Sequence, residues 1–456
     1  MSVAGVVTDP AVRQAFARDA SGMELVPEAV ARPTTVDEVA ELLRQASADR
    51  RPVTTAGGQT STTGASITDR GLLLSVRGLD RILELDPAGR FVRAGAGAIV
   101  GDVKRACAAA GVYLPLDPTS EDECTVGGAA ACNATGARSL KYGDTRRHIR
   151  AVEVFLADGS RHTFRRPRLE KNAVGYHFVQ DPVDWFIGSE GTLGVLTAVE
   201  FALLPDPGQV TGLAVPFDSE HLALRFVAEA REHPTLAPRC LEYFDARALE
   251  IVRAHAGGAG WTGSALVYAE SSGDLTAEFD EAAWLALAES CSARVDDITL
   301  FDGTSALGEA RRLRHSIPVT MNERSARARL TGGRKVSTDW AVPYRELGAV
   351  LEFTRRVADE RDLEHPVVFG HAGNGHPHQN WIAEDPAHLA RAEGVVEEVL
   401  REVLRRGGTV AAEHGIGKIK SRWVSLQLGP LQLRAMRALK RELDPYGLLA
   451  PGNLLP

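Results

Sequence analysis

The stretch from Asp117 to Thr145, DPTSEDECTVGGAAACNATGARSLKYGDT, constrains this chain more than any other. Four glycines lie in it, and alanine or small hydroxyl and amide residues fill most of its other positions. Such a segment builds little side-chain core, whereas glycine permits positive φ and a close approach of backbone to a ligand. Long loops without structure are uncommon unless they are functional, so the stretch predicts backbone lying against a flat, polar ligand. The simpler alternative is a long surface loop.

Two further segments have the same chemistry. Thr54 to Ser66, TTAGGQTSTTGAS, follows a strand-like start and shows no helical period, and Gly188 to Gly194 reads GSEGTLG. The pair Gly57-Gly58 and its hydroxyl neighbours could form a nest of backbone N–H groups for a pyrophosphate. Three glycine-rich loops, each beside β-type apolar runs, predict one large ligand that is held at several points.

These residues make the chain resemble the FAD-linked oxidases of the p-cresol methylhydroxylase and vanillyl-alcohol oxidase type. The resemblance is strongest to the D-2-hydroxyacid dehydrogenases, which include D-lactate, glycolate and D-2-hydroxyglutarate enzymes. It runs from about Pro27 to the C-terminus and is carried by the following motifs: Pro33-Thr34-Thr35, Gly57-Gly58-Gln59-Thr60-Ser61, Asp117-Pro118-Thr119-Ser120, Thr125-Val126-Gly127-Gly128, Asn133-Ala134-Thr135-Gly136, Lys141-Tyr142-Gly143-Asp144-Thr145-Arg146 and Gly188-Ser189-Glu190-Gly191-Thr192-Leu193-Gly194.

The resemblance implies a bound FAD cofactor and a set of residues that contact it. Covalent relatives carry a histidine after the paired glycines of the first loop, where this chain has Gln59, so we expect the FAD to be non-covalent. The implied cofactor-binding residues are Thr55, Ala56, Gly57, Gly58, Gln59, Thr60, Ser61, Pro118, Thr119, Thr125, Gly127, Gly128, Asn133, Gly136, Tyr142, Gly143, Glu190, Gly191, Gly194 and Asn453.

Composition narrows the class of protein. The chain has 456 residues, enough for two or three domains, and its net charge of −8 without a basic cluster argues against nucleic-acid binding. Five dispersed cysteines without a CxxC pair predict reduced thiols in a reducing compartment. The N-terminus lacks the basic region of a signal peptide, and the sequence contains no transmembrane-length apolar run. We expect a cytoplasmic protein, with peripheral membrane association and a homodimer left open.

The order of apolar patterns predicts an α+β fold rather than the βαβ repeats of a Rossmann fold. Thr35 to Glu38 is a capping box that begins a helix reaching about Ala48. Further helices are predicted near 10–18, 99–110, 219–233, 275–292, 343–360, 386–406 and 430–443, and strands near 52–54, 71–76, 82–85, 91–94, 149–156, 210–215 and 264–268.

Three parts of the chain are expected from these patterns and from the resemblance. Residues 1–205 would form an FAD-binding domain of the p-cresol methylhydroxylase type, with its core at about 27–205. Residues 206–430, which begin at the Pro- and Gly-rich segment Leu204 to Gly208, would form a substrate or cap domain with an antiparallel sheet covered by helices. Residues 431–456 would return to the FAD-binding domain.

Six of the thirteen histidines lie between His365 and His414. Asn374-Gly375 is a strong signal for a two-residue hairpin turn, which would place His371 opposite His378, close enough to share a metal ion. The alternative is a pair of surface histidines on an edge hairpin. Further on, Glu413 could complete a metal site and His414 could accept a proton, or both could lie in a turn before a helix that starts near Lys418.

The resemblance favours the metal site. It implies a divalent metal, zinc or else manganese or iron, bound by His371, His378 and Glu413, with His414 as the acid–base residue. His376 departs from the family pattern, because many relatives have asparagine there. Arg314 matches the region that supplies an arginine for the substrate carboxylate, although a solvated helix face is equally consistent with it. Lys335 and Asn380 are weaker candidates for the same pocket.

The function that the resemblance implies is FAD-dependent oxidation of a small D-2-hydroxy acid to the 2-oxo acid. Electrons would pass to a quinone, a cytochrome or an electron-transfer flavoprotein. One alternative within the fold is a flavin oxidase of another alcohol or an enzyme similar to alkylglycerone-phosphate synthase. Another is a flavin-binding electron-transfer subunit with a degenerate site, against which the intact pair Glu413-His414 argues.

Overall fold

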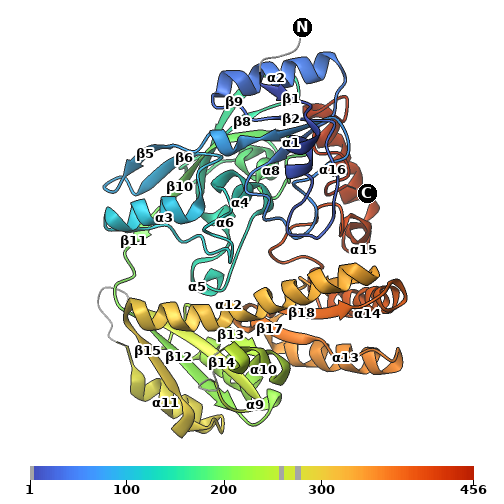
Figure 1. Ribbon diagram of the computed structural model, residues 1–456. Coiled ribbons are helices and arrows are strands. Elements are labelled where there is room, and N and C mark those ends of the chain that lie inside the picture. The colour runs from blue at the N-terminus through green and yellow to red at the C-terminus, as the bar shows by residue number, and fades with distance from the viewer. Residues whose placement is uncertain (1–4, 256–260, 273–278, 456) are drawn as a thin grey trace. The chain divides into compact units, whose positions relative to one another are not determined.

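The computed structural model describes residues 5–255, 261–272 and 279–455, and its backbone forms two compact units (Figure 1). The first unit consists of Met1–Gly136, Asp144–Asp206 and Glu413–Pro456, and the second consists of Ala137–Gly143 and Pro207–Ala412. The predicted helix start at Leu275 lies outside the described residues.

The first unit contains two main sheets. In one, the strand order is β1 (Val6–Val7), β2 (Ala29–Ala31), β4 (Leu72–Ser75) and β3 (Val53–Ala56), with β2, β4 and β3 parallel. The other is antiparallel, in the order β5 (Ile82–Asp86), β6 (Phe91–Gly95), β10 (Val195–Ala202), β8 (Ile149–Phe155) and β9 (Arg161–Arg165). A short pair joins β7 (Val112–Tyr113) to β11 (Leu204–Pro205).

The best-predicted helix of this unit is α2 (Val36–Ala48), which buries the apolar face expected from the sequence. It begins with the expected capping box, since Thr35 accepts from the N–H of Glu38 and the Glu38 carboxylate accepts from the N–H of Thr35. Its buried face packs into the same apolar core as the strands. The other helices are α1 (Pro10–Ala15), α3 (Val100–Ala109), α4 (Val126–Cys132), α6 (Thr145–His148), α7 (His177–Gln180), α8 (Val183–Phe186), α15 (Val424–Gln427) and α16 (Pro430–Leu443).

The C-terminal residues belong to the first unit. The N–H of Ala450 donates to the carbonyl of Val53 at 2.8 Å, and the N–H of Val53 donates to the carbonyl of Leu448 at 2.9 Å. Asn453 is buried, and its amide donates to the carbonyl of Ala65 at 2.8 Å. The chain end therefore extends the edge of the sheet that carries the first glycine-rich loop.

The second unit is built on one antiparallel sheet of seven strands, which confirms the α+β prediction. The order is β15 (Thr299–Asp302), β12 (Val210–Phe217), β14 (Ala265–Ser272), β13 (Cys240–Phe244), β17 (Val367–His371), β18 (His376–Ala383) and β16 (Arg334–Ser337). The helices are α5 (Ser139–Tyr142), α9 (Glu220–Glu232), α10 (Ala246–His255), α11 (Glu281–Ser290), α12 (Gly303–Ala328), α13 (Leu347–Glu360) and α14 (Pro386–Arg405). Both α10 and α12 pack on one sheet face, and α9 packs on the other through Phe226 and Phe217 (Figure 1).

The longest helix of the described residues, α12, is absent from the predicted elements. Pro318 lies inside it, and its buried positions, among them Ala310, Ile317 and Met321, are small or widely spaced. Proline normally ends a helix in sequence-based reasoning, and so sparse an apolar stripe gives little periodic signal. Packing against α10 and the sheet stabilises this helix, although its local sequence does not predict one.

The hairpin of β17 and β18 differs from the predicted one. His371 pairs with His376, and Phe369 pairs with His378, so the predicted pairing of His371 with His378 was wrong. Type I′ turns need positive φ at both central residues, but only Gly375 of the Asn-Gly pair has it, at 67°. Ala372–Asn374 form a 3-10 turn instead, and the N–H of Val342 donates to the carbonyl of Gly375 at 3.0 Å. A tertiary contact thus selects a longer turn.

The glycine-rich stretch Asp117 to Thr145 is divided between the units. Its middle part, Ala137–Gly143, belongs to the second unit. Arg138 fixes it there, because its guanidinium donates to Glu270 of β14 at 2.8 and 3.0 Å, and Arg239 lies 3.4 Å from the same carboxylate. Across the described residues, no helix has the length and apolar character needed to span a membrane.

Candidate functional site

Three glycine-rich loops meet in the first unit, as the sequence predicts for a large ligand. A Cβ atom on Gly58 would lie 2.2 Å from the carbonyl oxygen of Glu123, and one on Gly57 would lie 2.3 Å from Oγ1 of Thr125. These distances exclude any side chain, so both glycines are needed for the first loop to reach the second.

The third loop joins the same group. The N–H of Gly188 donates to the carbonyl of Ala130 at 3.1 Å, and the N–H of Glu190 donates to the carbonyl of Ala131 at 2.8 Å. Both acceptors lie in α4, which begins at the second loop. The loops thus form one backbone-rich surface.

Each loop also contains a non-glycine residue in the left-handed region. The φ angles are 55° at Gln59, 50° at Asn133 and 52° at Glu190. Such conformations cost free energy and concentrate at ligand sites. The side chain of Gln59 donates to the carbonyls of Phe16 and Arg18 at 3.0 and 3.1 Å, which holds the first loop against the N-terminal segment.

This surface suits FAD because backbone groups, hydroxyls and amides predominate and bulky side chains are few. Most residues predicted to bind the cofactor lie in the first unit. Tyr142 and Gly143 instead lie in the second unit, where the hydroxyl of Tyr142 accepts from Nε of Arg239 at 3.2 Å. Asn453 links segments of the first unit, since its Oδ1 accepts from Nζ of Lys418 at 2.7 Å.

Glu190 ties the third loop to the segment that follows His414. Its carboxylate accepts from the N–H groups of Ile416 and Gly417 at 2.5 and 2.7 Å. Burial raises the pKa of Glu190, although those two N–H groups act in the opposite direction. A Cβ on Gly415 would lie 2.6 Å from the Glu190 carboxylate, which explains the glycine at that position.

Three histidines cluster on the sheet of the second unit. His371, His376 and His378 are all buried, with exposed fractions of 2, 3 and 7%. Nδ1 of His371 lies 2.5 Å from Oε1 of Glu242 on β13. Nε2 of His376 lies 3.2 Å from Oδ1 of Asp339. A buried carboxylate therefore stands behind two of the three rings.

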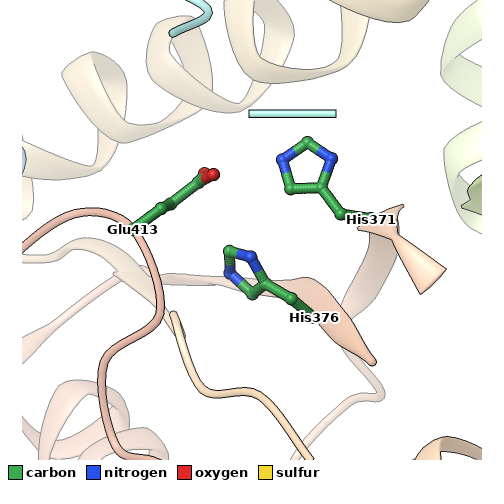
Figure 2. A group of neighbouring side chains, drawn as sticks. All are labelled: His371, His376 and Glu413. Carbon is green, nitrogen blue, oxygen red and sulfur yellow. The ribbon is translucent and has the colours of Figure 1, made fainter. Parts of the chain in front are cut away.

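Glu413 is the residue at which the chain leaves the second unit. The N–H of Ala412, just before it, donates to the carbonyl of Asp339 at 2.7 Å, which places Glu413 next to the residue behind His376. Figure 2 shows His371, His376 and Glu413 as neighbours, with the Glu413 carboxylate pointing toward the His371 ring. Their ligand atoms lie within 4.8 Å of one another, as do those of His378, Glu413 and His414.

The predicted metal ligands His371, His378 and Glu413 are thus distributed over two overlapping groups that share Glu413. Imidazole nitrogens and a carboxylate oxygen are ligands that divalent transition metals accept, so the donor set fits such an ion. His414, the predicted acid–base residue, lies beside this set, with Nε2 3.1 Å from Oε1 of Glu413.

Arg314 lies on α12 and is engaged by the carboxylate behind His371. Its Nε donates to Oε2 of Glu242 at 2.6 Å. Burial alone would raise the pKa of Glu242, but His371 and Arg314 outweigh it and hold that pKa well below the usual range. Lys335 on β16 donates to Oδ1 of Asn322 at 2.6 Å, and burial lowers its pKa to about 8. Asn380 is buried on β18.

Glu242 and Asp339 were not among the predicted site residues. Each did leave a signal, because Glu242 is the one charged residue in the strand Cys240–Phe244, and Asp339 directly precedes the buried Trp340. A lone acid within an apolar strand is costly unless it is paired, and so it indicates a nearby cation or ligand.

Comparison with known proteins agrees with the two-part organisation. Residues 27–165 match the FAD binding domain family, and residues 207–454 match the C-terminal domain of FAD linked oxidases. The chain is 31% identical to D-2-hydroxyglutarate dehydrogenase of Xanthomonas citri pv. viticola, covering 98% of this chain and 93% of the relative. It is 30% identical to glycolate oxidase subunit GlcD of Bacillus subtilis, and the match covers 94% of this chain and 89% of the relative.

A solved structure shows the same fold at lower identity. The structure of p-cresol methylhydroxylase with substrate bound superimposes with a TM-score of 0.73 at 16% identity, covering 99% of this chain and 93% of that one. The p-cresol methylhydroxylase-type fold and the FAD binding domain both agree with the surface formed by the three loops. The chain therefore belongs to the FAD-linked oxidases and is an FAD-dependent oxidoreductase.

Proposed function

We propose that the protein oxidises a small D-2-hydroxy acid to the corresponding 2-oxo acid with a divalent metal in the site. The observation that carries this proposal is that the ligand atoms of Glu413 lie within 4.8 Å of those of His371 and His376 in one group, and of those of His378 and His414 in another. The similarity to proteins named glycolate oxidase subunit and D-2-hydroxyglutarate dehydrogenase supports the substrate class.

The reaction removes two electrons and two protons from the substrate. When bound, FAD would supply the acceptor for the hydride that leaves C2, and a metal held by His371, His378 and Glu413 would polarise the C2 hydroxyl. His414, whose Nε2 lies 3.1 Å from Oε1 of Glu413, accepts the hydroxyl proton as the C2–O bond becomes a carbonyl.

The substrate carboxylate needs a cationic partner that fixes its orientation. We assign this role to Arg314, with Lys335 and Asn380 as further contacts. Nε of Arg314 donates to Glu242, so that carboxylate would set the orientation in which the guanidinium meets the substrate. Glu242 thus orients Arg314 and His371 together, which couples carboxylate binding to the metal site.

Anaerobic reduction of the flavin tests this proposal directly. The purified yellow protein should bleach at and below millimolar D-lactate, glycolate or D-2-hydroxyglutarate, with the matching L-isomers of the chiral acids and p-cresol as controls. Bleaching by simple alcohols or phenols but by none of the hydroxy acids would contradict the proposal. Subsequent re-oxidation by a quinone analogue, a cytochrome or an electron-transfer flavoprotein would identify the class of acceptor.

A further inference from the structure

His376 lies in the same buried cluster as His371 and His378 but is not among the metal ligands predicted from the sequence. We propose that His376 is itself a metal ligand, so that the ion in this protein binds three imidazoles and not two. The inference rests on the proposed metal site and specifies its composition.

The spacing of the three rings supports this assignment. The ring centroids of His371 and His376 lie 5.3 Å apart, those of His371 and His378 5.3 Å, and those of His376 and His378 4.8 Å. Imidazoles that bind one ion through nitrogens at about 2.0–2.1 Å have centroids roughly 4.5–5.5 Å apart in tetrahedral or octahedral sites. All three pairs fall in that range.

The backbone explains why the rings converge. His371 and His376 are directly paired across the hairpin, and side chains of such pairs lie on the same sheet face. His376 and His378 are two residues apart on β18 and therefore also share a face. The four-residue turn thus brings His376 into the position that a two-residue turn would have given to His378.

The carboxylates behind the rings provide a second, independent argument. Metal-binding histidines commonly direct their other ring nitrogen toward a carboxylate, which fixes the ring and its tautomer. His371 has Glu242 at 2.5 Å, and His376 has Asp339 at 3.2 Å. Both carboxylates are almost completely buried, with exposed fractions of 1 and 2%. His376 thus also has a buried carboxylate beside its ring, as an ion-pair contact where His371 has a hydrogen bond.

The proposal changes the expected metal preference. Three imidazole nitrogens and the Glu413 carboxylate form a nitrogen-rich donor set, which suits zinc and other late divalent transition metals rather than magnesium or calcium. Excess Mg²⁺ or Ca²⁺ should therefore fail to displace bound Zn²⁺ from this protein.

X-ray absorption on the zinc-loaded flavoprotein tests the proposal, because it counts imidazole ligands without depending on activity. The wild type should show three imidazoles and His376→Asn should show two. Zinc affinity, measured by chelator competition, should fall in His376→Asn by more than the roughly 10–100-fold that loss of an outer-shell partner costs. His365→Asn is the matched control, since His365 lies in the same unit but bonds to Asp359 on the protein surface. Flavin content and thermal unfolding verify that each variant is folded.

Asp339→Asn provides a second test, because it changes the carboxylate that lies 3.2 Å from Nε2 of His376 and leaves the three rings in place. It should keep three imidazoles while weakening zinc binding. An unchanged imidazole number and zinc affinity in His376→Asn would overturn the proposal and leave hydroxy-acid oxidation intact. Bleaching by hydroxy acids in a wild type that binds no zinc would also overturn it. Three imidazoles without bleaching by any hydroxy acid would support His376 as a ligand and contradict the proposed function instead.

Discussion

Two buried carboxylates determine how the histidine cluster can work. Glu242 contacts both Arg314 and His371, and Asp339 lies next to the ring of His376. A buried charge is costly without a partner, and here each carboxylate meets a ring that can carry a proton or bind a metal. The charges therefore hold the rings in place before any ligand binds, which lowers the entropy cost of assembling the site.

Glu413→Gln tests the carboxylate ligand. A neutral amide is a poorer ligand than a carboxylate, so metal content and turnover should fall together. The flavin spectrum should persist, because Glu413 lies outside the three glycine-rich loops. Glu397→Gln on the exposed face of α14 is the matched control. Full turnover of Glu413→Gln after exhaustive chelation, with metal shown to be absent, would refute a catalytic metal.

His414→Ala tests the proton acceptor. Loss of a general base should slow flavin reduction by roughly 10²–10⁴. Added imidazole should restore part of the rate, because a small base can enter the space left by the ring. The measurement is stopped-flow bleaching at saturating substrate, with metal content determined in parallel. Slow reduction without rescue, together with lost metal, would assign His414 to the metal site instead.

At the scale of elements, the glycine-rich loops act as one structure because backbone meets backbone. Gly58 has ordinary φ but no room for a side chain, whereas Gly308 on α12 has nothing near the place of its Cβ. Replacing each of these two glycines by alanine therefore distinguishes the effect of a steric clash from the general effect of replacing glycine in the backbone.

Gly58→Ala should release FAD and lower the unfolding temperature, because its Cβ would lie 2.2 Å from the backbone oxygen of Glu123. Gly308→Ala should keep FAD and gain about 0.5–1 kcal/mol of stability, since alanine favours a helix over glycine. Flavin absorbance after gel filtration and thermal unfolding measure both effects. Equal flavin content in the two variants would contradict a close contact between Gly58 and the backbone of Glu123.

Among the helices and turns, the sequence predicts those that depend on local signals and not those that depend on distant contacts. Helix α2 is predicted closely because its capping box and apolar face are local signals. The β17–β18 turn is not, because the contact of Gly375 with Val342 selects it, and α12 is missed because packing stabilises it around Pro318. The roles of Glu242 and Asp339 likewise depend on strands that are distant in sequence. Local chemistry indicates candidate ligands, whereas the strand register and the partners of those residues depend on the fold.

At the scale of the whole molecule, stability depends on pH through buried acids as well as through the net charge of −8. Asp245 lies in the second unit, and its carboxylate accepts from the N–H of Ala248 at 2.7 Å at the start of α10. Burial raises its pKa to about 7, Glu220 adds to the effect, and Arg247 and two backbone N–H groups oppose it.

The sign of the pH effect follows from proton binding. Between the unfolded pKa of about 3.8 and the folded pKa of about 7, the folded state holds a proton that the unfolded state has lost. Asp245 therefore lowers the free energy of unfolding progressively as pH rises through this window, and its penalty is complete above it. After allowance for partial exposure, the penalty is roughly 1–3 kcal/mol.

Asp245→Asn should remove this penalty and keep the helix cap, because asparagine caps as well as aspartate. The variant should unfold about 2–10 °C above the wild type at pH 8, and the gap should close as pH falls toward 4. Thermal unfolding of both flavoproteins between pH 4 and 8 measures the gap, with Asp218→Asn on the exposed surface as control. A gap of the same size at every pH would mean that Asp245 is charged throughout and that its burial does not limit stability.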